Sequence, residues 1–211
     1  MSKNKVKFGL SNCWMAPLTV DATTGEYTYD TPIRVPGAVN LSLSASGDSN
    51  DFYADNVIYF NSTANQGYEG DLEIALIPDE IRTQILGETV DSNGAFIENA
   101  NDRAKEFAFG FQINGDQTNR KYWYYNCSLT RPNLESSTIE SSIEPKTDTM
   151  TLKAMPRLSD QQVRAYLEPT EESQAAYDAF FESVYEAVVE SSNTNEGGEE
   201  NNENNDDNGG V

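Results

Sequence analysis

The sequence predicts a mainly β protein: an antiparallel β-sandwich with one or two flanking α-helices and a disordered acidic C-terminal tail. Short segments of alternating apolar and polar residues, separated by turn signals such as Pro36-Gly37, fill most of the chain. Only two segments have helical periodicity, which is too few for a parallel sheet with alternating strands and helices.

The division into domains follows from composition. Residues 191–211 carry six acidic residues, no basic residue and a single aliphatic residue, Val211. Such a segment cannot bury enough apolar surface to offset the entropy lost on ordering, so a disordered acidic tail is predicted there. Residues 1–190 are long enough for one sizeable core and are predicted to form the β-sandwich domain.

Alternation of apolar and polar residues predicts the strands. Residues 106–113 and 121–130 are expected to form a long hairpin at the centre of the core. A shorter hairpin is expected over residues 90–97, where Asn93 and Gly94 supply the two positive-φ positions of a type I′ turn. One face of the strand over 121–130 is predicted to carry Trp123, Tyr125, Cys127 and Leu129. The other predicted strands are residues 27–35, 38–44, 148–155 and 163–168.

Two helices are predicted among these strands. Pro78 suits the first helical position, two acidic residues follow it, and Gly87 suits the C-terminal cap, so a helix is expected over about residues 78–87. The second is expected over about residues 171–189, because apolar residues there recur at helical spacing and predict packing against a sheet face. Those residues are Tyr177, Phe180, Phe181, Val184 and Val188.

Charge and composition exclude several classes of function. The net charge is −21, from 14 basic and 35 acidic residues, so nucleic-acid backbones and anionic membranes repel the chain. It has no histidine, which excludes Ser-His-Asp and Cys-His catalytic sites and histidine metal sites. Cys13 and Cys127 are expected to be buried thiols, and a disulfide between them is the alternative. No signal peptide or membrane span is predicted, which indicates a soluble protein made in a reducing cytoplasm.

An acid-rich segment, "SGDSNDFYADN" at residues 46–56, is the first candidate site. The spacing of Asp48, Asp51 and Asp55 is compatible with a calcium loop, but an EF-hand is excluded because Phe52 and Tyr53 occupy its fifth and sixth positions. A calcium site of another type and a set of solvated loop acids are both left open.

Aromatic residues lie on both predicted faces of the stretch over residues 51–60. As a strand, it has Phe52, Ala54, Ile58 and Phe60 on one face, and Tyr53, Val57 and Tyr59 on the other. A strand at the surface of a monomeric sandwich should have a polar outer face. The pattern therefore predicts a strand buried on both sides or a second chain that covers one side.

Three acidic residues alternate with apolar residues in the strand that follows. Glu69, Asp71 and Glu73 are predicted to share one face, opposite Leu72, Ile74 and Leu76. Paired carboxylates at this spacing are compatible with a glycoside hydrolase, in which two acids flank the scissile bond. A solvated sheet face, or a wall that must stay hydrated and negative, explains the same pattern.

These residues also carry a resemblance to a known family. The run from Pro36 to Glu88 resembles the major tail protein, or tail-tube subunit, of siphovirus-type long-tailed phages of Gram-positive bacteria. The segments "KFGLSNCWMAPL", "YYNCSLTRP" and "YDAFFESVYE" are also similar, so that the likeness extends over about residues 5–188.

The resemblance implies a tail-tube fold and an assembly role. It implies six subunits in a ring joined by sheet extension, and rings stacked into a tube through which DNA is ejected. By this analogy, residues from about Gly47 to Gly70 form a hairpin that reaches a neighbouring subunit. The inter-subunit residues are then Asp48, Asp51, Phe52, Tyr53, Asp55 and Tyr59, and the lumen-facing acids are Glu69, Asp71 and Glu73.

The same resemblance implies the partners and the location. The partners are other copies of the chain and other tail proteins, namely the tape measure, the terminator and the distal tail protein. DNA passes without specific binding, and no enzymatic activity, cofactor, metal or membrane contact is implied. The expected location is the virion tail, and the host cytoplasm during assembly. The alternative function is a carbohydrate-binding or surface-layer β-sandwich module, which suits the tyrosine content.

Overall fold

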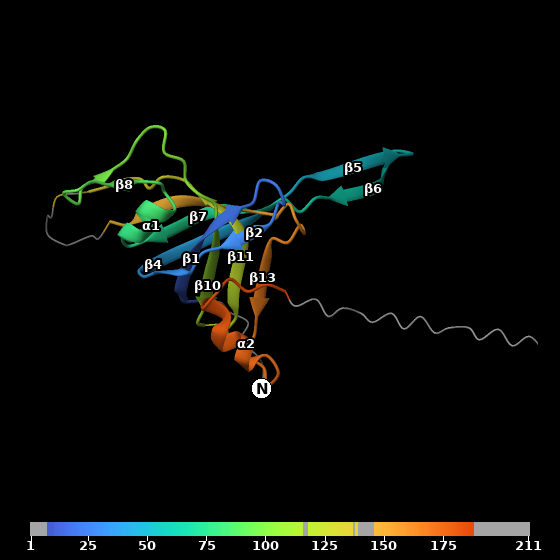
Figure 1. The fold of residues 1–211 in the computed structure, drawn as a ribbon. Coiled ribbons are helices and arrows are strands. Elements are labelled where there is room, and N and C mark those ends of the chain that lie inside the picture. The colour runs from blue at the N-terminus through green and yellow to red at the C-terminus, as the bar shows by residue number, and fades with distance from the viewer. Residues whose placement is uncertain (1–7, 116–117, 137, 139–145, 188–211) are drawn as a thin grey trace, which may run out of the picture.

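The computed structural model describes residues 8–115, 118–136, 138 and 146–187. The predicted disordered tail over residues 191–211 lies outside the described residues, as does Val188 of the predicted second helix. Within the described part of the chain the protein is mainly β, with a large antiparallel sheet and two short α-helices (Figure 1). These features of the predicted fold class are confirmed.

Nine of the described strands form one antiparallel sheet. Their order is β2-β1-β10-β11-β12-β7-β4, with β3 beside β1 and β13 beside β11. The strands are β1 (Leu10–Val20), β2 (Tyr27–Tyr29), β3 (Ile33–Val35), β4 (Ala38–Ser46), β7 (Gly67–Ile74), β10 (Phe107–Ile113), β11 (Lys121–Leu129), β12 (Asp148–Met155) and β13 (Arg164–Leu167). Two separate hairpins consist of β5 (Ser49–Ala54) with β6 (Val57–Thr63), and of β8 (Thr89–Val90) with β9 (Phe96–Ile97).

The main core lies between two halves of this sheet, one that contains β1 and β10 and another that contains β12, β7 and β4. Side chains of β1 and β10, such as Met15 and Phe109, belong to the same buried cluster as Leu72 of β7 and Leu152 of β12. Helix α1 (Asp79–Gln84) contributes Ile81 to this cluster. It lies within the predicted residues 78–87 but is shorter, with Pro78 as its N-cap and Ile85 instead of Gly87 as its C-cap. Strand β11 joins the two halves, because its first residues pair with β13 and its last residues pair with β12.

A second core covers the opposite face of β10 and β11. Helix α2 (Gln174–Asp178) and the 3-10 helix η1 (Ala179–Phe181) pack there, and Trp123 Nε1 donates a 2.7 Å hydrogen bond to the carbonyl oxygen of Phe180. The helix is much shorter than the predicted residues 171–189, because the chain tightens into η1 and then leaves helical geometry. The predicted apolar residues that are described, Tyr177, Phe180, Phe181 and Val184, are all buried.

A β-bulge in β11 overturns one predicted face. Phe107 lies opposite Cys127, but Phe109 lies opposite Tyr124, so β11 has one extra residue between these pairs. The extra residue reverses the alternation of side chains. As a result, Trp123 and Tyr125 face the second core, whereas Cys127 faces the main core with Leu129. The prediction that these four side chains share one face is therefore wrong.

Other predicted turns and strands need smaller corrections. The loop between β8 and β9 is no type I′ turn, since Gly94 has a positive φ and Asn93 does not. Instead, the carboxylate of Asp91 accepts hydrogen bonds from the backbone N–H groups of Asn93 and Ala95, which shapes a longer loop. The predicted strand over residues 27–35 is divided into β2 and β3, which pair in turn with β1.

Both cysteines are free and buried, as predicted. They belong to the main core, where burial raises the pKa of the Cys13 thiol to about 12. Burial also raises the pKa of Cys127, which lies fully inside. Such thiols are protonated at neutral pH and act as small apolar core residues.

Candidate functional site

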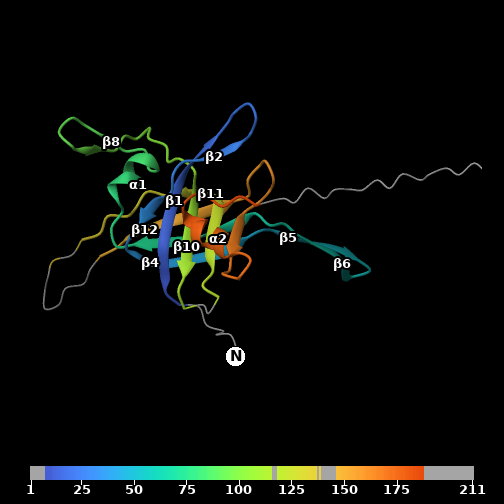
Figure 2. The same ribbon diagram turned by 60° about the horizontal axis from the view of Figure 1, so that its bottom comes forward.

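The hairpin of β5 and β6 projects from the body of the protein (Figures 1 and 2). It continues the antiparallel pair of β4 and β7, because β4 leads into β5 and β6 leads into β7. Two backbone hydrogen bonds bridge the junction: Ala64 N–H donates to Asp48 O at 3.0 Å, and Gln66 N–H donates to Ser46 O at 2.9 Å. A hairpin is therefore present in the single chain within the expected residues 47–70, but it covers only residues 49–63, because Gly67 to Gly70 belong to β7 of the main sheet.

A two-residue turn closes the hairpin at its tip. Asp55 and Asn56 have φ values of 52° and 62°, and a type I′ turn requires positive φ at both positions. The earlier interpretation of this stretch as one continuous strand is wrong for this reason. Tyr53 lies opposite Ile58, on the same side of the hairpin, whereas simple alternation put them on opposite faces.

Large apolar side chains on the hairpin are exposed. Tyr59 is 75% exposed, and four further apolar side chains of the hairpin are each more than half exposed. They are Tyr53, Val57, Ile58 and Phe60. A lone two-stranded hairpin is at most marginally stable in water, and soluble monomers rarely display apolar groups gathered in this way. The structure thus presents an apolar surface that nothing in the same chain covers among the described residues.

The three aspartates of the hairpin do not converge on one point. Asp51 accepts a hydrogen bond from the side chain of its cross-strand neighbour Asn61, and Asp48 accepts one from Gln66 Nε2 at 3.3 Å. Asp55 occupies the turn. Across the described parts of the chain, no group of three or more carboxylate or thiol side chains lies close enough to hold a metal ion. Phe52 lies in β5 opposite Phe60, and its side chain is outside what the structure describes.

The three acids of β7 lie together on a polar sheet face, as their alternation predicts. Glu69 and Asp71 are exposed and Glu73 is half-buried, whereas Leu72 and Ile74 point into the main core. The prediction that Leu76 shares the face of Leu72 and Ile74 is wrong: it is exposed, because β7 ends at Ile74. The neighbours of the acids across β4 and β12 are also polar. They are Asn40, Ser42 and Ser44 on β4, and Thr149, Thr151 and Lys153 on β12.

Polar contacts hold two of these carboxylates in place, and a cation lies beside the third. Thr147 Oγ1 donates a 2.5 Å hydrogen bond to Glu73, and Thr151 Oγ1 donates a 3.4 Å one to Asp71. Lys153 Nζ lies 3.7 Å from Glu69 Oε2, in a pair that is half exposed. The sequence pattern did not reveal Lys153 as a partner, because the register between β7 and β12 brings it there.

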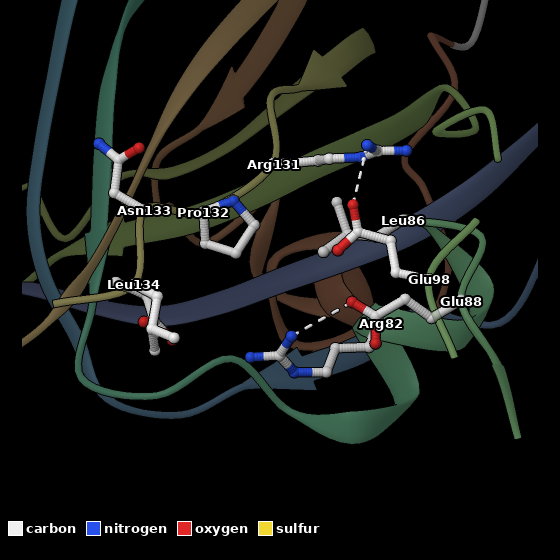
Figure 3. A pocket seen from close by; sticks show the side chains of 9 residues that line it. Arg82, Leu86, Glu88, Glu98, Arg131, Pro132, Asn133 and Leu134 are labelled. Carbon is white, nitrogen blue, oxygen red and sulfur yellow. Dashed lines mark hydrogen bonds and ion pairs between the residues drawn. The ribbon is translucent and has the colours of Figure 1, made fainter. Parts of the chain in front are cut away.

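A separate pocket of about 310 Å³ lies beside α1 and was not predicted. Two arginines line it, and Figure 3 shows that each is paired with a glutamate. Arg82 Nη1 lies 3.2 Å from Glu88 Oε1, and Arg131 Nη1 lies 2.8 Å from Glu98 Oε1. Because their charges are matched by these neighbours, the arginines are poor ligands for an additional anion.

The comparisons with known proteins do not identify the chain. No protein-family model matches it, and no curated protein is significantly similar to it. Within the part of the chain that is described, no helix is long and apolar enough to span a membrane. The projecting hairpin and the polar face of β7 are therefore the two features from which a function can be argued.

Proposed function

We propose that this chain is a structural subunit of a long-tailed phage virion, which self-assembles as stacked hexameric rings into a tail tube for DNA ejection. The observation that carries the proposal is the exposed apolar surface of the hairpin formed by β5 and β6. The resemblance of residues 5–188 to tail-tube subunits supplies the kind of assembly. Other tail proteins are the further partners, and no catalytic role is assigned.

The energy available from the hairpin supports an assembly role. Full burial of one large apolar side chain stabilises a complex by about 1.5–3 kcal/mol. Five such side chains are exposed on each hairpin. Association costs at least about 4 kcal/mol in lost translational and rotational freedom, so coverage of most of this surface is needed for a stable contact. A neighbouring copy of the same chain supplies that cover at every subunit.

The polar face of β7 supports the proposed conduit. Phosphates of a passing DNA feel wall charges within a Debye length of about 8 Å at physiological salt. Glu69, Asp71 and Glu73 repel them, and Lys153 offsets part of this charge. We assign the three carboxylates to the lumen wall. A reconstruction of the polymer with these side chains on its outer surface would remove them from that role.

Electron microscopy of concentrated full-length protein tests the assembly. The wild-type chain and Leu158→Ser, a control at an exposed position outside the hairpin, are expected to form rings or tubes. The double variant Ile58→Ser, Tyr59→Ser is expected to remain monodisperse, because it loses two exposed apolar groups of the hairpin. Monodisperse wild-type particles under all conditions would contradict the proposal and favour a carbohydrate-binding or surface-layer module.

A further inference from the structure

We infer that the hairpin of one copy docks into a depression, lined by apolar side chains and by polar backbone and Asn40, at the opposite end of β4 in the next copy. The inference rests on the proposed function and specifies the surface that receives the hairpin. The depression has a volume of about 310 Å³ and lies where β1 and β4 begin and β10 ends. Its apolar lining consists of Phe8, Leu10, Val39, Leu41, Phe111 and Ile113.

Two exposed apolar residues form the rim of this depression. Phe8 is 63% exposed and Val39 is 51% exposed. Two hydrogen bonds fix the backbone beside Phe8, from Gly115 N–H to Phe8 O at 2.7 Å and from Asn114 N–H to Gly9 O at 2.8 Å. The ring of Phe8 lies over Gly115, where an added Cβ would come within 2.4 Å of it. The depression is thus formed before any partner binds, which lowers the cost of docking.

The positions of the two surfaces favour contact between different copies. Val39 is the second residue of β4, and the hairpin begins after its last residue, Ser46. Seven residues of extended strand separate them by roughly 23 Å. The hairpin also points away from the body (Figures 1 and 2), so it does not fold back onto its own depression. A protrusion at one end and a recess at the other produce a head-to-tail contact, which closes into rings or continues as a filament.

The charges of the two segments favour the hairpin as the occupant. Residues 46–66 contain Asp48, Asp51 and Asp55 and no basic residue. The seven residues of the chain up to Lys7, which immediately precedes Phe8, contain three lysines and no acidic residue. This is a local excess of positive charge in a chain with 35 acidic and 14 basic residues. Because Lys7 is bonded directly to Phe8, its charge favours contact of this end of the protein with the acidic hairpin over contact between two hairpins.

Cysteine cross-linking in assembled protein tests the docking. The double variant Val39→Cys, Tyr59→Cys is treated with a short bismaleimide, and the native cysteines stay unreactive because both are buried. A ladder of cross-linked oligomers is expected, at least fivefold stronger than in the control Leu158→Cys, Tyr59→Cys. Tyr53→Cys in place of Tyr59→Cys preserves the test if Tyr59 is itself needed for docking.

The outcomes separate this inference from the proposed function. Tubes that show no cross-link from position 39 to position 59 or 53 would overturn the docking and leave the tube proposal intact. Cross-links confined within one chain, or between two copies of Val39→Cys alone, would also overturn it. Cross-linked oligomers without rings or tubes would support the docking and contradict the tube.

Discussion

Arg157 is a buried cation that ties the end of the described chain to the body. Its guanidinium is paired with Asp160 at 2.5 Å and with Glu186 at 2.7 Å, and it lies 4.2 Å from the ring centre of Tyr125. Burial acts to raise the pKa of Asp160, but hydrogen bonds from Arg157 and from the backbone of Gln162 outweigh it and hold that pKa below its ordinary value. One residue therefore links the β12–β13 turn, the second core and the segment after η1.

Replacement of this residue should destabilise the fold. We expect Arg157→Met to lower the free energy of unfolding by about 2 kcal/mol, since it removes the charge-assisted hydrogen bonds of a buried guanidinium to two partly exposed carboxylates. The control Lys153→Met removes a half-exposed ion pair with Glu69 and should cost less than about 1 kcal/mol. Urea denaturation measures both, and equal losses would contradict the structural role of Arg157.

The difference in the free energy of unfolding between the wild type and Arg157→Met should also depend on pH. A carboxyl whose pKa is lowered by folding stabilises the protein above its unfolded pKa, about 3.9 for aspartate, and this contribution is lost as the pH falls through the folded pKa. The difference in stability between the wild type and Arg157→Met should therefore narrow below about pH 4, as Asp160 becomes protonated.

At the scale of elements, the junction between the sheet and the hairpin depends on close backbone contacts. Gly67 begins β7 with a φ of 101°, and an added Cβ would lie 1.9 Å from the carbonyl oxygen of Ala154 in β12. Gly47, in the link between β4 and β5, would place a Cβ 1.9 Å from the carbonyl oxygen of Ala64. Both positions require glycine so that the strands can approach at the base of the hairpin.

Alanine substitution of Gly67 and of Gly25 should separate two contributions to the loss of stability, the strain of a positive φ and the steric overlap of the added Cβ. Gly67→Ala is expected to destabilise the protein by about 3 kcal/mol or more, from the positive φ and from the clash with a backbone oxygen. Gly25→Ala is the matched control, because Gly25 also has a positive φ but has no atom within 4 Å of the added Cβ. It should cost about 1 kcal/mol. Similar values for the two variants in urea denaturation would show that the close approach to Ala154 is unimportant.

At the scale of the whole molecule, net charge opposes the proposed assembly. Every copy carries a formal charge of −21, and six of the acidic residues lie in residues 191–211. Copies of like charge repel each other over the Debye length, which is about 30 Å at 10 mM salt and about 8 Å at 150 mM. Assembly therefore needs enough salt to screen this repulsion.

Deletion of residues 191–211 tests the contribution of the acidic tail to solubility. The deletion reduces the net charge from −21 to −15, since −21 + 6 = −15. We expect the shortened chain to polymerise at lower salt and with an earlier onset of light scattering than the full chain. An unchanged onset across a salt series would show that the tail does not keep the subunits apart.

Local patterns predicted several elements correctly. The central hairpin of β10 and β11, helix α1 and the buried residues of the C-terminal helical segment follow from alternation, caps and helical spacing. Strand β1 was not predicted, because its apolar and polar residues do not alternate strictly and it contains Pro17. Its pairing with β10, with a register shift between Ser11 and Trp14, maintains it as a strand.

The sequence by itself determined the mainly β class, the central hairpin and the shared face of Glu69, Asp71 and Glu73, because each depends on neighbours within one segment. Only the tertiary structure decided the bulge that turns Trp123 away from Cys127, the turn at Asp55 and Asn56, and the place of Lys153 beside Glu69. These features depend on register between strands distant in sequence or on a specific turn, and alternation within one segment carries no information about either.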